Sequence, residues 1–303
     1  MPRLFTRTSG IVALVFGLGL TLAGHATEVQ IAHGGLTLNG ILELADGKTM
    51  TDGAVLITHG TLAHNGMEIV QSLQGLLKDR GVSSLAITLS LGLSDRRGMY
   101  DCQVPHTHRH ADAVVEIAAW VQWLKQQGAR QVVLLGHSRG GNQTAWYASE
   151  QKDPAITRVV LVAPLVQDAQ GITDGYRKGF NKDLAPVVDQ ARAMVAKGQG
   201  RDLMKPVDIL YCAGAAATPE SVLSYHAFDP HFRTPDLVAR IPVPVLVVVG
   251  GADDTLPGLD RTFGPLVQPG KVEMVVVDGA DHFFRDLYGE EVADAVVSFI
   301  GKP

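Results

Sequence analysis

Apolar residues along this chain follow two patterns, and both predict strands. Residues 36–44 alternate apolar and polar side chains, which is typical of an antiparallel strand with one face in water. Later apolar runs are continuous and rich in valine, as in strands that are covered on both faces. These runs predict buried strands at residues 54–58, 84–89, 132–135, 159–162, 245–249 and 272–277.

Helix-length patterns lie between these strands at residues 67–78, 111–126 and 141–150, and after the last strand at residues 290–300. In the last of them, Val292, Val296 and Ile300 fall on one stripe. Because strand and helix alternate, the order predicts an α/β fold, with a mostly parallel, doubly wound sheet and helices on both faces. In such folds the active site lies at the carboxyl ends of the strands.

One segment, residues 166–240, interrupts the alternation with a single helical stretch at 184–196 and short pieces divided by Gly and Pro. It is too long for a connecting helix, so we predict a lid over the carboxyl edge of the sheet. A second structural layer without contact to substrate is the alternative. The predicted core then comprises residues 27–165 and 241–303.

The first 26 residues have the features of an export signal. Arg3 and Arg7 precede an apolar stretch at 11–23, and the sequence Gly-His-Ala ending at Ala26 has small residues at both recognition positions. We therefore expect a signal peptide that is cleaved after Ala26, and a periplasmic or secreted protein. An uncleaved membrane anchor is the alternative, although two glycines make the stretch a poor spanning helix.

Composition excludes some classes of function. The chain is 46% hydrophobic and 19% charged, which is ordinary for a globular protein, and its net charge of −5 includes no basic block. We therefore expect a small-molecule substrate and no nucleic-acid partner. In an oxidising compartment, Cys102 and Cys212 either form a disulfide or remain two unrelated buried thiols, and the sequence leaves this open.

Ser138 is the candidate nucleophile. It stands at the centre of Gly-His-Ser-Arg-Gly, directly after a buried strand, where Gly136 and Gly140 permit the sharp turn that exposes a serine hydroxyl. Such a hydroxyl needs an imidazole to take its proton, and the imidazole needs a carboxylate to orient it. Asp253 and His282 each follow a later strand, so all three residues reach the same edge of the sheet in the order Ser, Asp, His.

From these residues the sequence resembles the α/β-hydrolase family over nearly all of residues 35–302. The resemblance rests on His59-Gly60, Gly-His-Ser-Arg-Gly, Gly-Gly-Ala-Asp-Asp-Thr-Leu-Pro and Gly-Ala-Asp-His-Phe-Phe. In this family the acid usually ends a Gly-x-x-Asp sequence and a proline follows four residues later, a spacing that Asp253 fits. Asp254 and, more remotely, Asp168 are the alternatives.

The oxyanion of the tetrahedral intermediate needs two hydrogen-bond donors. The backbone N–H of Arg139, directly after the nucleophile, supplies the first. The His59-Gly60 loop resembles the family's His-Gly loop, whose next residue usually gives the second donor. This implies Thr61, with Leu62 as the alternative.

Other polar residues have less specific patterns. We regard His59, Arg96 and Arg97 as candidate substrate contacts, since these arginines, with Arg139, would recognise an anionic substrate, although exposed loop arginines are common. Three alternating histidines precede Asp112 and suggest metal ligands, but histidines that are solvated or hydrogen-bonded to their loop are the commoner case. They are His106, His108 and His110. Four lid aromatics either line a pocket or, as we prefer, pack the lid: Tyr176, Phe180, Tyr225 and Phe228.

The sequence thus predicts an exported serine hydrolase that cleaves a carboxylic ester through an acyl-enzyme intermediate, with no cofactor and no metal. The same triad also serves thioesters, amides and peptides, so a thioesterase or a peptidase is the nearest alternative. A non-catalytic homologue that only binds a ligand is the alternative from a different class.

Overall fold

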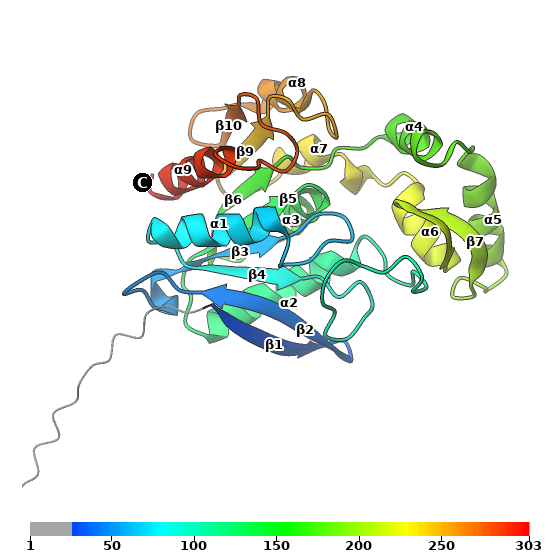
Figure 1. Cartoon of the computed structure of the whole chain (residues 1–303), viewed down its shortest axis with the longest axis horizontal. Coiled ribbons are helices and arrows are strands. Elements are labelled where there is room, and N and C mark those ends of the chain that lie inside the picture. Colours follow the sequence, from blue (N-terminus) through cyan, green and yellow to red (C-terminus); the bar gives the residue numbers. More distant parts are fainter. Residues whose placement is uncertain (1–25, 303) are drawn as a thin grey trace, which may run out of the picture.

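The computed structural model describes residues 26–302, so all but the last residue of the predicted signal peptide lies outside the described residues. Eight strands form one sheet in the order β1-β2-β4-β3-β5-β6-β9-β10 (Figure 1). β2 pairs antiparallel with β1 and β4, and all other neighbours are parallel. The strands are β1 (Thr27–His33), β2 (Leu36–Glu43), β3 (Ala54–Thr58), β4 (Ser84–Thr88), β5 (Val132–His137), β6 (Ile156–Val162), β9 (Val245–Gly250) and β10 (Val272–Val277).

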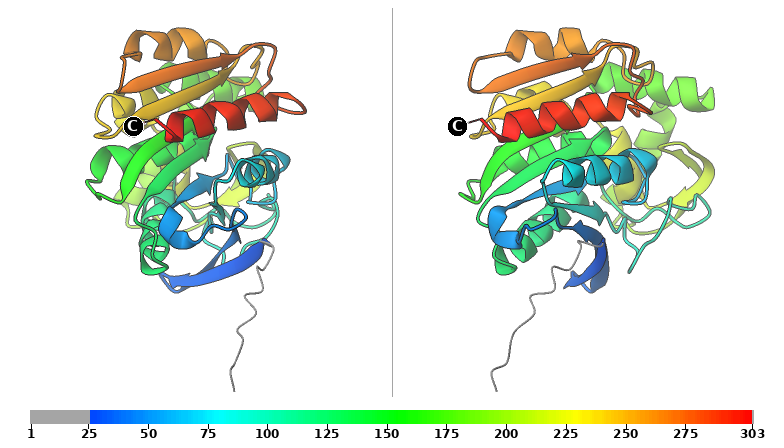
Figure 2. Two further views of the ribbon diagram at one scale, coloured as in Figure 1. Left: turned by 90° about the vertical axis from the view of Figure 1, so that its left-hand side faces the viewer. Right: turned by 60° about the vertical axis from the view of Figure 1, so that its left-hand side comes forward.

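Helices cover both faces of this sheet, which confirms the predicted fold class. Helices α1 (Glu68–Asp79) and α9 (Tyr288–Ile300) pack together on one face, and α2 (Asp112–Gln126) and α3 (Arg139–Glu150) pack on the other (Figures 1 and 2). Every residue of β3, β4 and β5 is therefore buried, as the continuous apolar runs predict. None of the helices described is long and apolar enough to cross a membrane.

The segment between β6 and β9, which we call the insertion (residues 166–240), lies beside the main sheet (Figure 1). Its strands β7 and β8 form a separate antiparallel hairpin. Its elements are α4 (Ala169–Phe180), α5 (Ala185–Ala196), β7 (Met204–Ile209), β8 (Cys212–Ala217), α6 (Pro219–His226), η2 (Pro230–Phe232) and α7 (Thr234–Val238). Three short helices elsewhere are η1 (Met50–Asp52), α8 (Leu259–Phe263) and η3 (Gly264–Leu266).

The sequence pattern predicts only α5 within the insertion, for physical reasons. Helix α4 contains three internal glycines, which weaken helix propensity. Strand β8 reads Cys-Ala-Gly-Ala-Ala-Ala and lacks the β-branched residues that mark a strand. Strand β1 is also missed, because only two of its seven residues are large and apolar.

The insertion is fastened to the loop before α2. Cys102 and Cys212 form a disulfide, with their Cα atoms 5.4 Å apart, so the pairing alternative holds. Backbone hydrogen bonds continue the contact, since the His106 N–H donates to the Ala216 carbonyl over 2.8 Å and the Thr218 N–H to the His106 carbonyl over 2.9 Å. The loop and the insertion therefore form one wall of the region above the strand ends.

Candidate active site

Ser138 occupies a strained turn between β5 and α3. Its backbone φ of 55° and ψ of −122° lie in a region that residues other than glycine rarely adopt. A Cβ at Gly136 would clash with the Gly140 carbonyl, and one at Gly140 with the His59 carbonyl, so only glycine allows this approach. The turn leaves the serine side chain partly exposed above the strand ends.

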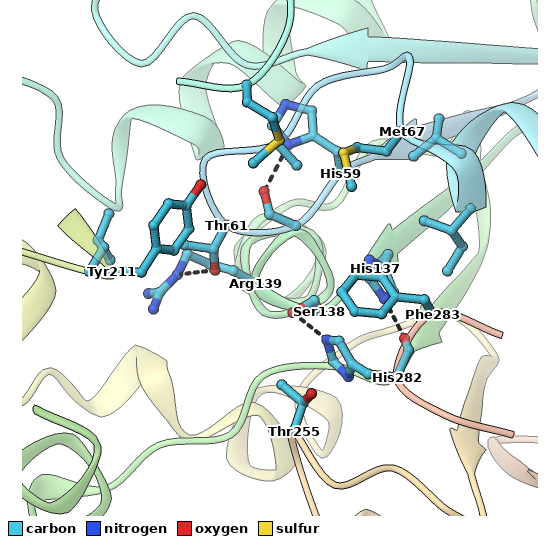
Figure 3. A pocket seen from close by; sticks show the side chains of 16 residues that line it. His59, Thr61, Met67, His137, Ser138, Arg139, Tyr211, Thr255, His282 and Phe283 are labelled. Carbon is cyan, nitrogen blue, oxygen red and sulfur yellow. Dashed lines mark hydrogen bonds between the residues drawn. The ribbon is translucent and has the colours of Figure 1, made fainter. Parts of the chain in front are cut away.

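A line of hydrogen bonds joins Ser138, His282 and Asp253 (Figure 3 shows its Ser138–His282 part). The Ser138 hydroxyl lies 2.9 Å from His282 Nε2, and His282 Nδ1 lies 2.8 Å from Asp253 Oδ2. An Nδ1–H that donates to the carboxylate leaves Nε2 free to accept the serine proton. Since the residues follow the parallel strands β5, β9 and β10, the sheet brings them to one edge.

Asp253 is held as a carboxylate. Burial acts to raise its pKa, but hydrogen bonds from His282 and from the backbone N–H groups of Leu256 and Thr255 outweigh burial and keep the pKa below its usual value. The structure identifies Asp253, and neither of the two alternative acids, as the carboxylate that contacts His282. Asp254 is exposed, and Asp168 is exposed at the start of α4, where it caps the Gly171 N–H.

Thr61 and Arg139 both line the cavity beside Ser138. Arg139 is the first residue of α3, so its N–H has no partner within the helix and is available to an oxyanion. Thr61 follows β3, the strand next to β5, and its loop passes directly over the Ser138 turn. Leu62, the alternative donor, is itself buried, with a φ of 52°.

The cavity above Ser138 has a volume of about 390 Å³. One wall is apolar, with Met67, Ile69, Val70 and Phe283. The insertion contributes the turn between β7 and β8 to another wall. The remaining lining residues are His59, Gly60, Thr61, Ala63, Met99, His137, Ser138, Arg139, Leu210, Tyr211, Thr255 and His282. The sequence pattern misses Met99, Leu210 and Tyr211, because only the folding of the insertion onto the loop before α2 brings them to the cavity.

The structure does not bring the predicted substrate contacts Arg96 and Arg97 to the cavity, which corrects that prediction. The Arg96 side chain is buried and donates to the carbonyls of Leu89, Gly98 and Ala63. The Arg97 side chain is exposed and pairs with Glu28. His59 does line the cavity, but its ring donates to the Gly60 carbonyl and accepts from the Leu89 N–H, so the ring holds the loop.

The three alternating histidines are buried and their rings are hydrogen-bonded, so of the two expected cases the solvated one is wrong. His106 Nδ1 lies 3.2 Å from His108 Nε2, and His108 Nδ1 lies 2.7 Å from the hydroxyl of Tyr225 in the insertion. His110 Nε2 lies 2.7 Å from Asn142 Oδ1 on α3. Among residues 26–302, no group of three or more His, Cys, Asp or Glu side chains is arranged to hold a metal ion.

The four aromatic residues considered in the sequence, Tyr176, Phe180, Tyr225 and Phe228, do not line the cavity. Tyr176 packs against Phe180, with 4.9 Å between ring centroids, and Tyr225 packs against His108 and His110. Phe228, which follows α6, is exposed and lines a smaller hollow together with His110. Aromatic packing therefore stabilises the insertion internally and against the core.

Buried histidines predict that acid destabilises the fold. Burial lowers the pKa of His226 to about 4, so between about pH 4 and 6.5 the unfolded chain binds this proton and the folded chain does not. The free energy of unfolding therefore rises with pH across this window and falls as the pH falls. Each such histidine contributes about 1.4 kcal/mol per pH unit. Burial also lowers the pKa of five more histidines: His59, His106, His108, His110 and His137.

We expect the free energy of unfolding in urea to fall steeply from pH 7 to pH 5. His226→Gln keeps an acceptor for the Leu210 N–H and removes the titrating ring. Below pH 6 the unfolding free energy of this variant should fall less steeply than that of the wild type. The two slopes should differ by about 1.4 kcal/mol per pH unit, the contribution of one histidine. Parallel pH profiles for the wild type and His226→Gln would contradict this account.

Comparisons with known proteins show the family and the fold of this chain. The model of the alpha/beta hydrolase family matches residues 55–295. The bifunctional esterase/perhydrolase DCH of Acinetobacter calcoaceticus is 25% identical over 228 residues, which cover 68% of this chain and 79% of that protein. The structure of Est1E from Butyrivibrio proteoclasticus with bound ferulic acid has a TM-score of 0.65 and 21% identity, covering 90% of this chain and 97% of that one. The Pyrococcus furiosus esterase PF2001 has a TM-score of 0.61 and 17% identity, covering 91% of each chain.

Proposed function

This chain belongs to the alpha/beta hydrolase family, and on that premise we propose that it is a serine esterase that cleaves carboxylic esters through an acyl-enzyme intermediate. The proposal rests on the hydrogen bonds that link Ser138 to His282 and His282 to Asp253. Ser138 and His282 both line the cavity. The esterases among its relatives support ester hydrolysis as the reaction.

In the first half-reaction, Ser138 Oγ attacks the ester carbonyl carbon and its proton passes to His282 Nε2. Asp253 stays ionised and stabilises the imidazolium that forms. The negative charge on the former carbonyl oxygen is bound by the N–H groups of Arg139 and Thr61. The intermediate then expels the alcohol, which takes the proton from His282, and the acyl group remains on Ser138.

In the second half-reaction, His282 takes a proton from water as the water oxygen attacks the acyl carbon. The new tetrahedral intermediate is bound by the same two N–H groups. Its collapse breaks the bond to Ser138 Oγ, which regains the proton from His282, and releases the carboxylic acid. A cavity of about 390 Å³ suits a small-molecule ester.

The test is labelling by a fluorophosphonate probe combined with turnover of 4-nitrophenyl esters. We expect the wild type to be labelled at one site and to hydrolyse short-chain esters, and Ser138→Ala to do neither. Ser149→Ala, a half-buried serine near the other end of the same helix, is the matched control and should label normally. Failure of the folded wild type to label, or equal labelling of Ser138→Ala, would rule out the proposal.

A panel that places thioesters and peptide amides beside esters of graded acyl length then defines the bond that is cleaved. Faster turnover of an amide or a thioester than of every ester would replace the esterase assignment. The triad roles would remain the same, since the attacked carbonyl carbon is common to all three substrate classes.

We also propose that the protein is exported and that the insertion acts as a lid. Export is supported by the signal-like residues 1–26 and by the Cys102–Cys212 disulfide, which persists in oxidising compartments. The lid is supported by Leu210 and Tyr211, which the insertion contributes to the cavity wall. Secreted or periplasmic protein should begin at Thr27; an N-terminus that still carries Met1 would contradict cleavage.

A further inference from the structure

Arg139 is a buried cation without an acidic partner. The residue is only 8% exposed, lines the cavity and directly follows the nucleophile. Within residues 26–302, no Asp or Glu oxygen lies within 4.0 Å of its guanidinium. Arg96 is equally buried, but Arg96 directs its donors at three backbone carbonyls. A buried charge without an opposite charge is costly, so the unpaired guanidinium of Arg139 needs an explanation.

Neutral groups hold the guanidinium in place. Nε donates to the Thr61 hydroxyl over 3.0 Å, and Nη1 donates to His110 Nδ1 over 3.4 Å. The Tyr225 ring lies 5.5 Å from the guanidinium carbon. A guanidinium has five N–H donors, so in the described chain one donor on Nη1 and both on Nη2 are left without a protein acceptor.

His110 is fixed as a neutral acceptor toward Arg139. Asn142 Nδ2 donates to the His231 carbonyl and to the Thr234 hydroxyl, so its Oδ1 must accept the proton of His110 Nε2. His110 Nδ1 then presents a lone pair to Arg139. Burial lowers the pKa of His110 to about 3, so the ring carries no charge that could balance or oppose the guanidinium near neutral pH.

Arg139 remains charged under the same conditions. Burial lowers its pKa, but only to about 10. The free edge of the guanidinium therefore presents one full positive charge and three N–H donors to a cavity whose other lining residues include no lysine or arginine. This single charge matches a singly charged anion, and a planar fork of donors matches a carboxylate in particular.

We propose that Arg139 binds a carboxylate of the substrate, so that the enzyme prefers esters that carry a second, anionic group over neutral esters of the same shape. Arg139 is thus a specificity-determining residue, with Thr61 and His110 positioning its side chain. The inference rests on the proposed function, since it names the substrate class of the same site.

The arrangement of the cavity fixes where each part of such a substrate lies. Arg139 and Tyr211 lie on one side of Ser138, and Phe283 lies on the other (Figure 3). With the ester carbonyl at Ser138, the carboxylate extends toward Arg139 and Tyr211. The uncharged part of the substrate then contacts Phe283 and Met67.

The test compares matched esters that differ only in charge. Mono-4-nitrophenyl adipate carries a free carboxylate, and 4-nitrophenyl methyl adipate is its neutral counterpart. A second pair, 3-carboxyphenyl butanoate and its methyl ester, places the charge on the alcohol side. For the wild type we expect kcat/KM to favour the anionic ester about tenfold or more in at least one pair, as a charge-assisted hydrogen bond provides.

Arg139→Met should bring this ratio to about one, and Arg139→Lys should give an intermediate ratio, because a lysine keeps the charge and loses the fork. The ratio is the readout, since a general loss of activity affects both esters of a pair. Arg97→Met, which removes an exposed arginine paired with Glu28, is the matched control and should keep the wild-type ratio. If Arg139→Met does not fold, as judged by circular dichroism, Arg139→Lys provides the same comparison.

Failure of the proposed role of Arg139 is distinguishable from failure of the proposed serine esterase function. A wild type that hydrolyses both esters of each pair equally well would overturn the role of Arg139 and leave the serine esterase intact. A preference that survives in Arg139→Met would overturn it as well. A wild type that hydrolyses none of the four esters, and is not labelled by the fluorophosphonate, would overturn the proposed function itself.

Discussion

Replacing His282 by alanine is expected to lower kcat/KM for 4-nitrophenyl butanoate by about 10⁴- to 10⁶-fold. The His282 ring is the group within hydrogen-bond distance of the Ser138 hydroxyl, at 2.9 Å. Without it the serine proton has no acceptor, and the alcohol that leaves has no proton donor. Steady-state rates with the 4-nitrophenyl ester measure the loss, and circular dichroism establishes that the variant is folded.

His137 supplies the matched control, because its ring lies next to that of His282, with 4.9 Å between the centroids. Its Nε2 donates to the His282 carbonyl over 2.9 Å, so it supports the backbone of the loop and does not take the serine proton. His137→Gln keeps a donor there and should lose no more than about tenfold, the value of one hydrogen bond. Equal losses in the two variants would contradict the assignment of His282 as the base.

Replacing Asp253 by asparagine is expected to lower kcat by about 10⁴-fold, the effect of this change in other Ser-His-Asp sites. Asparagine preserves the shape of the side chain. Its neutral amide no longer fixes the His282 tautomer that leaves Nε2 free, and it no longer stabilises the imidazolium. The variant should therefore bind substrate and fold normally while its turnover is nearly lost, which separate kcat and KM values would reveal.

Asp254→Asn is the matched control, since it makes the same chemical change one residue later in the chain. Asp254 is exposed, whereas the carboxylate of Asp253 is buried and accepts hydrogen bonds from His282 and from two backbone N–H groups. We expect Asp254→Asn to retain wild-type turnover, as surface substitutions usually do. A large loss in Asp254→Asn with little loss in Asp253→Asn would exchange the two roles.

The arginines illustrate where reasoning from the sequence was not sufficient. Arg96, Arg97 and Arg139 share one chemical property and all lie near strand ends, so the sequence could not rank them as substrate contacts. Their surroundings distinguish them. Arg96 is satisfied by backbone carbonyls, Arg97 pairs with Glu28 in solvent, and Arg139 faces the cavity with donors unused.

The insertion shows a second limit. Its hairpin and helix α4 have weak local propensities, so tertiary contacts decide their structure. The hairpin is held by the Cys102–Cys212 disulfide and by bonds to the histidine-containing loop, and α4 packs Ile172 and Tyr176 into a small core of the insertion. Pattern alone therefore could not assign Tyr211 to the cavity wall. Nor could it predict that His106, His108 and His110 are buried, because polar residues in a loop give no periodic signal of burial.

By itself the sequence determined the fold class, most strands of the main sheet, and Ser138 and His282 as the candidate nucleophile and base, with Asp253 preferred over two alternative acids. Those features depend on local patterns, since buried strands are continuous apolar runs and parallel strands end at one edge. Tertiary structure alone decided which acid contacts His282, which arginine faces Ser138 and which residues close the cavity. Those features depend on distances between segments remote in sequence, which no periodicity or spacing along the chain encodes.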